Sequence, residues 1–428
     1  MLDFQTAINA LHQHLPVADY LQRPAEQIAL HSAMGRVLAK DLRADRDLPP
    51  FPRSMMDGFA IRSADFESQR DFMVIGTALA GQEHDLQIGA GEAVRIMTGA
   101  AVPAGADSVI KIEETSAFIS GRSGSVAPQT TPGNVRFNTD SVNPGQNISP
   151  RGEEAHKGDV LAASGTTIDV SVLTLAAATG QTQLAVRALP NVSIIVTGDE
   201  LVAVEDTPGP HQIRNSNGPM LSALLEELGV QARTFMVADR PDAIRSLLDR
   251  VLDEADFVLL TGGVSAGDTD FVPGLLAEAG VQSIFHKVRM RPGKPIWAGA
   301  RKQTMVFGLP GPPFSCRITF KLFVEPAVRR CMGIVEASMR SVPMQTARSK
   351  KHDLIEFFRA RVVYSDEGAP SLFNIHAPAG AHSIERLQVI SHRGSSDVTA
   401  TLQSTGIGVH PANQPELRPG DAVLFLPW

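Results

Sequence analysis

Val192-Ser193-Ile194-Ile195-Val196 leads directly into Thr197-Gly198-Asp199-Glu200, an apolar run followed by a polar glycine loop. The same order recurs where the apolar run 256–260 leads into the glycine-rich loop 261–270, and where 305–307 leads into Gly308-Leu309-Pro310-Gly311. Helical patterns separate the first two apolar runs, so the strands should be parallel and their loops should lie at one edge of the sheet. This stretch therefore predicts an α/β domain with a binding edge.

The predicted edge combines glycines with acids. Glycine-rich loops expose backbone N–H groups to phosphate, and carboxylates beside them hold divalent cations. Glu200, Asp268 and Asp270 fall in these loops. Asp268 has an equally good alternative role as a turn or N-cap acid before a helix that begins near Phe271. The pattern predicts a pocket for a phosphorylated small molecule.

Composition narrows the class of protein. The chain has 428 residues, of which 43% are apolar and 20% charged, with a formal net charge of −7. This length predicts more than one domain, and this charge argues against nucleic acid or an anionic membrane as partner. The chain contains no apolar run of the ~20 residues that a membrane span needs. The start resembles an amphipathic helix, not a signal peptide, and the two cysteines, Cys316 and Cys331, lack metal-type spacing. We expect core thiols and a cytoplasmic protein.

Composition also divides the chain into segments. Residues 3–40 carry helical periodicity, with Asp3 as a predicted N-cap, whereas 46–156 is rich in Gly, Pro and Ser and has short alternating strands. Helices are predicted at 171–180, along the apolar stripe that begins at Met220 and ends at Gly229, and after Pro241. From about Val342 the pattern is mostly β.

Several longer motifs, taken together, resemble one family. The chain resembles the molybdopterin molybdenumtransferases, the MoeA and gephyrin E-domain family, from about residue 3 to its C-terminus. Any single short glycine motif is weak, but seven in the family's order across some 260 residues are specific. The matching segments are 49–60, 94–107, 147–153, 197–201, 262–265, 292–295 and 308–311.

The resemblance implies a fold, a reaction and an assembly. It implies a multidomain α/β chain: an elongated linking domain (1–45 and 157–187), an inserted small β domain (46–156), a central parallel-sheet molybdopterin-binding α/β domain (188–335) and a C-terminal β-barrel (340–428). The implied reaction inserts molybdate into adenylylated molybdopterin and releases AMP, with Mg²⁺ as the divalent cation. The implied assembly is a homodimer whose cleft joins two subunits, with a molybdopterin adenylyltransferase or a client molybdoenzyme as a further partner.

The resemblance also points to site residues. The candidate catalytic residues are Asp57, Thr98, Glu200, Asp270 and Lys287, and the candidate metal ligands are Glu200, Asp268 and Asp270. The candidate substrate-binding residues are Thr197, Gly198, Asp239, Gly262, Gly263, Ser265, Asp268, Arg291, Lys294, Pro310, Pro313 and Ser315.

Some of these residues have simpler alternative roles. Asp57 before Gly58 is also a common turn sequence, and Thr98 is also an ordinary turn hydroxyl. Asp239 before Arg-Pro is an equally good helix cap. Arg289 is interpreted as part of a solvated face.

The chain departs from the family's pattern at several positions. The family usually has Asp-Asn at Pro52-Arg53, arginines near Ser149, aspartate at Glu154, lysine at Arg291 and asparagine at Pro312. Proline removes a backbone donor, and Arg for Lys changes geometry and reach. Three interpretations follow: a molybdenum-inserting enzyme, which we favour, a cofactor-binding paralogue without turnover, and a scaffold of the gephyrin kind.

Overall fold

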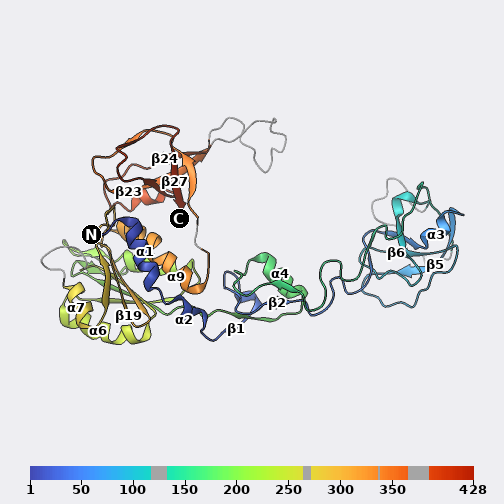
Figure 1. Cartoon of the computed structure of the whole chain (residues 1–428), viewed down its shortest axis with the longest axis horizontal. Coiled ribbons are helices and arrows are strands. Elements are labelled where there is room, and N and C mark those ends of the chain that lie inside the picture. Colours follow the sequence, from blue (N-terminus) through green and yellow to red (C-terminus); the bar gives the residue numbers. More distant parts are fainter. Residues whose placement is uncertain (117–132, 264–270, 336–337, 365–384) are drawn as a thin grey trace. The chain divides into compact units, whose positions relative to one another are not determined.

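The computed structural model describes residues 1–116, 133–263, 271–335, 338–364 and 385–428. The chain forms two compact units (Figure 1). The first comprises Met1–Gln27, Gly35–Ala39 and Ala185–Trp428, and the second comprises Ile28–Met34 and Lys40–Leu184. The chain is thus a mixed α/β protein with several sheets, as predicted, whereas the exact boundaries of four domains stay a prediction.

A six-stranded sheet forms the centre of the first unit. Its order is β15 (Ala232–Val237), β12 (Val192–Thr197), β16 (Phe257–Thr261), β20 (Thr304–Leu309), β19 (Trp297–Arg301) and β17 (Gln282–His286). The first four strands are parallel, which confirms the sequence prediction. β19 runs antiparallel to both of its neighbours, so β17 again points in the direction of the first four. The loops after β12, β15, β16, β20 and β17 therefore share one edge.

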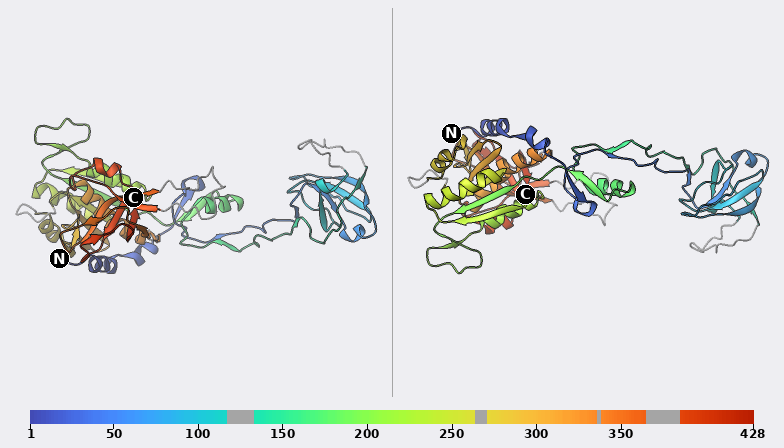
Figure 2. Two further views of the ribbon diagram at one scale, coloured as in Figure 1. Left: turned by 90° about the horizontal axis from the view of Figure 1, so that it is seen from above. Right: turned by 90° about the horizontal axis from the view of Figure 1, so that it is seen from below.

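Alternate side chains of this sheet enter two different cores. Ile194 and Phe307 lie in a cluster with α5 (Asn217–Glu226), α8 (Pro313–Thr319) and α9 (Glu325–Met332). Ile195 and Val306 lie in a second cluster with α6 (Pro241–Glu254) and α7 (Val272–Glu278). Because successive strand residues face opposite sides, helices cover both faces and the result is a three-layer arrangement. The excursion 198–216, with short strands β13 (Leu201–Val202) and β14 (Ile213–Arg214), stands out from this body as a green loop in Figure 2.

The predicted helical periodicity over 3–40 is correct only at its start. α1 (Phe4–His14) begins at the predicted cap, where Asp3 accepts the Thr6 N–H over 2.9 Å, and α2 (Val17–Leu21) follows. Beyond this the chain forms β1 (Glu26–Ala29) and a 3₁₀ turn (Leu30–Ser32). Pro24 explains the change, since the residue before a proline disfavours helical geometry.

The last part of the first unit is a small barrel. β21 (Arg340–Pro343), β27 (Ala422–Pro427), β25 (Gly406–His410), β23 (Ile355–Tyr364) and β24 (Glu385–Val389) are consecutive neighbours. A bridge between Met344 and Leu387 closes the circle, and the interior holds apolar residues such as Phe358 and Phe425. Short β18 (Met290–Arg291) adds to β23, so the barrel is tied to the segment that follows β17.

The second unit holds a β domain and α4. Its five-stranded sheet has the order β7 (Ser108–Lys111), β4 (Gly58–Ile61), β6 (Glu92–Ile96), β5 (Asp71–Ala78) and β8 (Asn134–Arg136). A bridge between Thr115 and Phe137 joins the chain beyond β7 to the chain beyond β8. The predicted helix near 171–180 is α4 (Val170–Ala178), capped by Asp169. Across the described ranges of both units, no helix is long and apolar enough to cross a membrane.

Candidate functional site

The carboxyl ends of β12 and β15 are tied together by acids. Thr197 Oγ1 donates to Asp239 Oδ1 over 2.9 Å, and the Asp239 N–H donates to Asp199 Oδ1 over 3.1 Å. The alternative role of Asp239 as a helix cap is wrong, because Arg240 is the N-cap of α6 and no side chain caps that helix. Asp239 instead belongs to the loop cluster at the sheet edge.

Glycines let the β16 loop approach this cluster. Gly262 has a φ of +99°, and a Cβ placed on it would lie 2.0 Å from the Thr197 carbonyl oxygen. Gly263 has a φ of +61°, and a Cβ there would lie 3.6 Å from Asp239 Oδ1. Only glycine fits the first position. The predicted loops 197–200 and 262–263 therefore lie in direct contact.

Asn217 connects three elements of the edge and was missed from the sequence. Its Nδ2 donates to Thr261 Oγ1 over 2.9 Å and to the Gly311 carbonyl over 2.8 Å. These bonds link the start of α5, the end of β16 and the loop after β20. The buried Oδ1 of Asn217 has no hydrogen-bond partner among the described residues. The only available signal was an asparagine at the start of a predicted helix, which usually indicates a cap.

The residues after β20 form the next part of the edge. Pro310 is buried, Gly311 is exposed, and Pro313 is the first residue of α8. Ser315 is 5% exposed and lies in the first turn of this helix. Cys316 follows, and burial raises the pKa of its thiol to about 12, as expected for a core thiol. The segment that holds the three predicted substrate-binding residues is thus joined to Asn217 through the Gly311 carbonyl, with Pro310 and Ser315 buried and Pro313 half-buried.

Of the three predicted metal ligands, one is described at this edge and two lie outside the described residues. Glu200 is exposed and curls toward Gly198, where an added Cβ would lie 2.8 Å from its Oε2. Asp268, Asp270 and the predicted contact Ser265 lie outside the described residues. Among the residues that are described, no group of three or more His, Cys, Asp or Glu side chains is arranged to hold a metal. The side-chain carboxylate of Glu200 has no hydrogen-bond partner in the described chain. Carboxylate oxygen atoms are the ligand type that Mg²⁺ prefers.

Three predicted cations follow β17 at the same edge. Lys287 is half-buried, and its backbone is fixed by an N–H bond to the Ile296 carbonyl over 2.9 Å. Arg291 and Lys294 are exposed, and no described acid pairs with any of these three side chains. Two strand spacings, or roughly 10 Å, separate β17 from β20. Arg289 pairs with Asp353, which agrees with its interpretation as part of a solvated face.

Asp57 and Thr98 meet in the second unit. Asp57 Oδ1 accepts both the Thr98 N–H, over 2.7 Å, and the Thr98 hydroxyl, over 2.8 Å. Both residues are exposed. Gly58, the first residue of β4, packs so closely against β7 that an added Cβ would lie 1.9 Å from the Ile110 carbonyl oxygen. A carboxylate and a hydroxyl far apart in the sequence are thus held as one polar pair.

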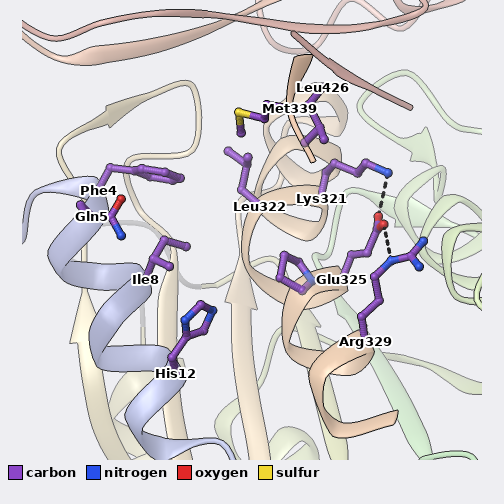
Figure 3. Close-up of a pocket in the computed structure, with 11 residues that line it drawn as sticks. Phe4, Gln5, Ile8, His12, Lys321, Leu322, Glu325, Arg329, Met339 and Leu426 are labelled. Atoms are coloured by element: carbon purple, nitrogen blue, oxygen red, sulfur yellow. Dashed lines mark hydrogen bonds and ion pairs between the residues drawn. The ribbon is translucent and has the colours of Figure 1, made fainter. Parts of the chain in front are cut away.

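A separate cavity of about 160 Å³ lies between α1, α9 and the barrel. Figure 3 shows Phe4 and Ile8 on one wall and Glu325 between Lys321 and Arg329 on the other. Glu325 accepts from Lys321 over 2.9 Å and from Arg329 over 2.8 Å. None of the predicted site residues lines this cavity. It is therefore distinct from the sheet edge.

The fold and the edge define the class of protein. An open, mostly parallel sheet with glycine and acid loops at its carboxyl edge is typical of α/β proteins that bind small molecules there. A family model described as "MoeA N-terminal region (domain I and II)" matches residues 2–180, and one described as "Probable molybdopterin binding domain" matches 193–330.

Relatives match most of the chain. A molybdopterin molybdenumtransferase of Staphylococcus aureus is 34% identical over 379 residues, covering 84% of this chain and 87% of the relative. One from Staphylococcus epidermidis is 38% identical over 312 residues, covering 72% and 71%. The crystal structure of the molybdopterin biosynthesis MoeA protein of Pyrococcus horikoshii covers all of both chains at 25% identity, with a TM-score of 0.78. The chain belongs to the molybdopterin molybdenumtransferase family.

Proposed function

We propose that this chain inserts molybdenum into adenylylated molybdopterin and releases AMP, as a cytoplasmic step of molybdenum cofactor biosynthesis. Membership of the transferase family supports the reaction. The single observation that supports the location is the meeting of three loops at one sheet edge: residues 197–200 contact residues 262–263 directly, and Asn217 joins Gly311 to Thr261. Exposed backbone N–H groups in such loops suit a phosphate, and the nearby Lys287 suits a second anion.

The charge of each site residue determines its proposed role. Lys287, Arg291 and Lys294 attract molybdate and the phosphates, because cations without described acid partners retain their capacity for anions. The glycine loops orient the molybdopterin phosphate, and Asp57 with Thr98 orients the oxygen groups around the reacting bond. An oxygen of molybdate or of water attacks the adenylyl phosphorus, the P–O bond of the phosphoanhydride breaks, and AMP leaves with the new oxygen while the other phosphate stays on molybdopterin. The two dithiolene sulfurs bind the molybdenum of molybdate in exchange for oxide, which leaves as water.

Mg²⁺ belongs to this proposal as the divalent cation. Glu200, Asp268 and Asp270 would hold it, since carboxylate oxygens in loops at a phosphate site are its usual ligands. When bound, the ion would offset negative charge that develops on the phosphoanhydride oxygens.

AMP release from adenylylated molybdopterin and molybdate tests the reaction. The wild type should release AMP only when molybdate is added, and Lys287→Ala should lower this release. Tight binding of molybdopterin by the wild type without any AMP release would instead favour the second candidate, a cofactor-binding paralogue. That candidate is kept because Arg53, Glu154, Arg291 and Pro312 depart from the family's pattern.

We also propose a homodimer with composite sites, in which Asp57 and Thr98 complete the edge of the neighbouring subunit. Mixing Asp57→Asn subunits with Lys287→Ala subunits tests this proposal. Each variant removes a residue from a different half of the composite site, Asp57 from the β domain or Lys287 from the sheet edge. Random exchange should restore about a quarter of wild-type turnover, since half of the dimers are mixed and each has one intact site. No recovery, or a fully active monomer in light scattering, would contradict composite sites. A molybdopterin adenylyltransferase that supplies the substrate, or a client molybdoenzyme, is the proposed further partner.

A further inference from the structure

A single parallel bridge joins residue 2 to the loop that follows β17. Leu2 pairs with Val288 in this bridge. The Leu2 N–H donates to the Lys287 carbonyl over 3.3 Å, and the Leu2 carbonyl accepts the Arg289 N–H over 2.8 Å. Lys287 is the half-buried cation assigned to anion binding. A residue far away in the sequence is therefore bonded directly to the main chain of a candidate site residue.

The main chain of Lys287 has an uncommon conformation. Its φ is +68°, in the left-handed region that residues with a Cβ rarely occupy. Its N–H donates to the Ile296 carbonyl over 2.9 Å, and its carbonyl accepts the Leu2 N–H. A conformation of this kind costs free energy and persists only where the surrounding contacts hold it. Leu2 thus provides one of the two main-chain bonds that hold Lys287.

Three contacts fix the position of Leu2. Its half-buried side chain packs against the large core cluster on the α5, α8 and α9 side of the sheet. Asp3, the next residue, is the N-cap of α1. Phe4 then packs against Phe323 and Phe357, with ring centres 5.6 Å and 5.2 Å apart. Residue 2 therefore lies between the core and the fixed start of a helix, and it is a rigid support for Lys287.

The rest of the loop after β17 is equally fixed. Val288 and Met290 are 0% exposed, and the Val288 N–H donates to the Lys294 carbonyl over 2.9 Å. Met290 also pairs with Ile355 of β23. Because the direction of a side chain follows the conformation of its backbone, a return of Lys287 to negative φ would point its side chain elsewhere. The direction of the Lys287 ammonium group thus depends on the bridge to Leu2.

We infer that Leu2 is a positioning residue of the anion site, which holds Lys287 in the left-handed conformation and thereby directs its ammonium group at molybdate. The inference rests on the role of Lys287 in the proposed function and deepens it, since it assigns the segment before α1 to the construction of the site. Leu2 does not contact the anion and acts only through Lys287.

Equilibrium binding of molybdate to the full-length protein tests this inference. Leu2→Asn keeps the size of the side chain but places an amide against an apolar core, so the bridge should open. The Kd for molybdate should rise roughly three- to thirtyfold, because the charge-assisted contact of Lys287 is weakened. Leu2→Met retains an apolar side chain and should bind like the wild type. Ile8→Ala is the matched control, because Ile8 on α1 packs against the same core and has no bond to this loop among the described residues.

A double-mutant cycle distinguishes positioning from a general loss of stability. In the Lys287→Ala background, Leu2→Asn should have no further effect on the Kd, because the ammonium group that Leu2 directs is absent. A general loosening of the fold would weaken binding by the same factor in both backgrounds, and that result would overturn the inference.

Thermal unfolding tests the backbone conformation without any ligand. Lys287→Gly should unfold at a higher temperature than Lys287→Ala, since glycine adopts positive φ without the cost that a Cβ brings. Leu2→Asn should reduce this difference, because residue 287 is then free to relax. A difference that Leu2→Asn leaves unchanged would show that Leu2 does not hold this conformation, and the inference would be wrong.

The outcomes for the inference and for the proposed function are separable. An unchanged Kd in Leu2→Asn, with weak binding by Lys287→Ala, would overturn the inference and leave the proposed function intact. Equal binding by Lys287→Ala and the wild type, or no binding by the wild type, would overturn the inference together with the assigned role of Lys287. AMP release is a separate measurement: its absence in the wild type would count against the proposed function, whereas a raised Kd in Leu2→Asn would still support the inference.

Discussion

Arg53 donates from Nη2 to Glu154 Oε1 over 2.7 Å, and both residues stand where the family usually has a different residue. β3 (Arg53–Ser54) also pairs with β9 (Ile148–Ser149), where Arg53 lies opposite Ser149, another departure. Departures from two distant segments of the sequence are therefore one local cluster in the β domain.

The first prediction concerns the free energy of this ion pair. Its side chains are 43% and 57% exposed, so water screens the attraction. Arg53→Ala and Glu154→Ala should each lower stability by less than about 1 kcal/mol, with a coupling of about 0.2–1 kcal/mol in a double-mutant cycle. Urea unfolding of the four proteins measures this. A coupling above this range would mean that the pair is not a simple surface ion pair.

The second prediction concerns the polar pair formed by Asp57 and Thr98. Asp57→Asn should lower AMP release about a hundredfold or more, because the carboxylate that organises the Thr98 hydroxyl is lost. Thr98→Ser should keep most activity and Thr98→Val should lose it, since serine retains the hydroxyl. Asp71→Asn is the matched control, because Asp71 is an exposed acid of the same unit paired with Arg136. Equal AMP release from Thr98→Val and the wild type would remove Thr98 from the catalytic residues.

The sheet edge was predictable because alternation of strands and helices determines strand direction. β12, β16 and β20 are buried at every residue, which matches their apolar sequences, and their loops meet as expected. Local pattern could not decide the role of Asp239, since Asp-Arg-Pro before a helix is an equally good cap. The pairing of β15 with β12 decided it by placing Asp239 beside Thr197.

Other features depend on contacts that short motifs do not contain. Asn217 lies at the start of a helix, and its role depends on Thr261 and Gly311, which are 44 and 94 residues away. Arg359 is an arginine in a β pattern, which predicts an exposed side chain, yet Phe314 and two backbone carbonyls enclose it. In both cases, polar groups in a buried place find their hydrogen-bond partners far away in the sequence.

The third prediction tests Asn217 as the connector of the loops. Asn217→Ala should lower stability by about 1–3 kcal/mol, because the buried Thr261 hydroxyl and the Gly311 carbonyl both lose a donor. It should also raise the substrate Kd, since the loops after β16 and β20 lose their common anchor. Ser222→Ala on the same helix is the control, because Ser222 contacts only Thr234 by a side-chain bond at 3.1 Å in the described chain. Binding and urea unfolding measure both effects, and unchanged values in both would contradict the role.

The fourth prediction concerns pH and the buried His410 of the barrel. Its Nδ1 accepts from Arg348 over 2.7 Å, so Nε2 carries the proton and donates to the Gln414 carbonyl over 2.8 Å. Burial, and then the Arg348 charge, lower the pKa of His410 below its ordinary value. A histidine that is neutral when folded stabilises the protein above its unfolded pKa of about 6.5.

The expected stability therefore falls as the pH drops below about 6.5, because the unfolded chain then binds a proton that the folded chain excludes. His410→Gln should be less stable at pH 8 but should lose less stability between pH 7 and pH 5 than the wild type. His211→Gln, at an exposed histidine, is the control. Thermal unfolding across this pH range measures the difference, and parallel curves for wild type and His410→Gln would show that His410 does not contribute.

The last prediction uses Pro312, the N-cap of α8, where the family usually has asparagine. Pro312 has a φ of −60° and a ψ of 127°, and no side chain caps this helix. In Pro312→Asn the new amide oxygen would find the Phe314 N–H already bonded to Ser395, which leaves the Ser315 N–H as its target. A cap contributes about 0.5–2 kcal/mol, and loss of proline costs about 0.4–1 kcal/mol through the unfolded chain. The free energy of unfolding should thus change by between about −0.5 and +1.6 kcal/mol.

The effect of Pro312→Asn on turnover separates the two leading interpretations of the departures. If the chain is an active transferase, the variant and Arg291→Lys should change the KM for molybdate modestly, while AMP release by the wild type is already measurable. If the chain is a binding paralogue, AMP release should be absent in the wild type and should arise only in the restored variants. We expect the first outcome, because Asp57 and Thr98 form their pair and Lys287 has no described acid partner to neutralise it.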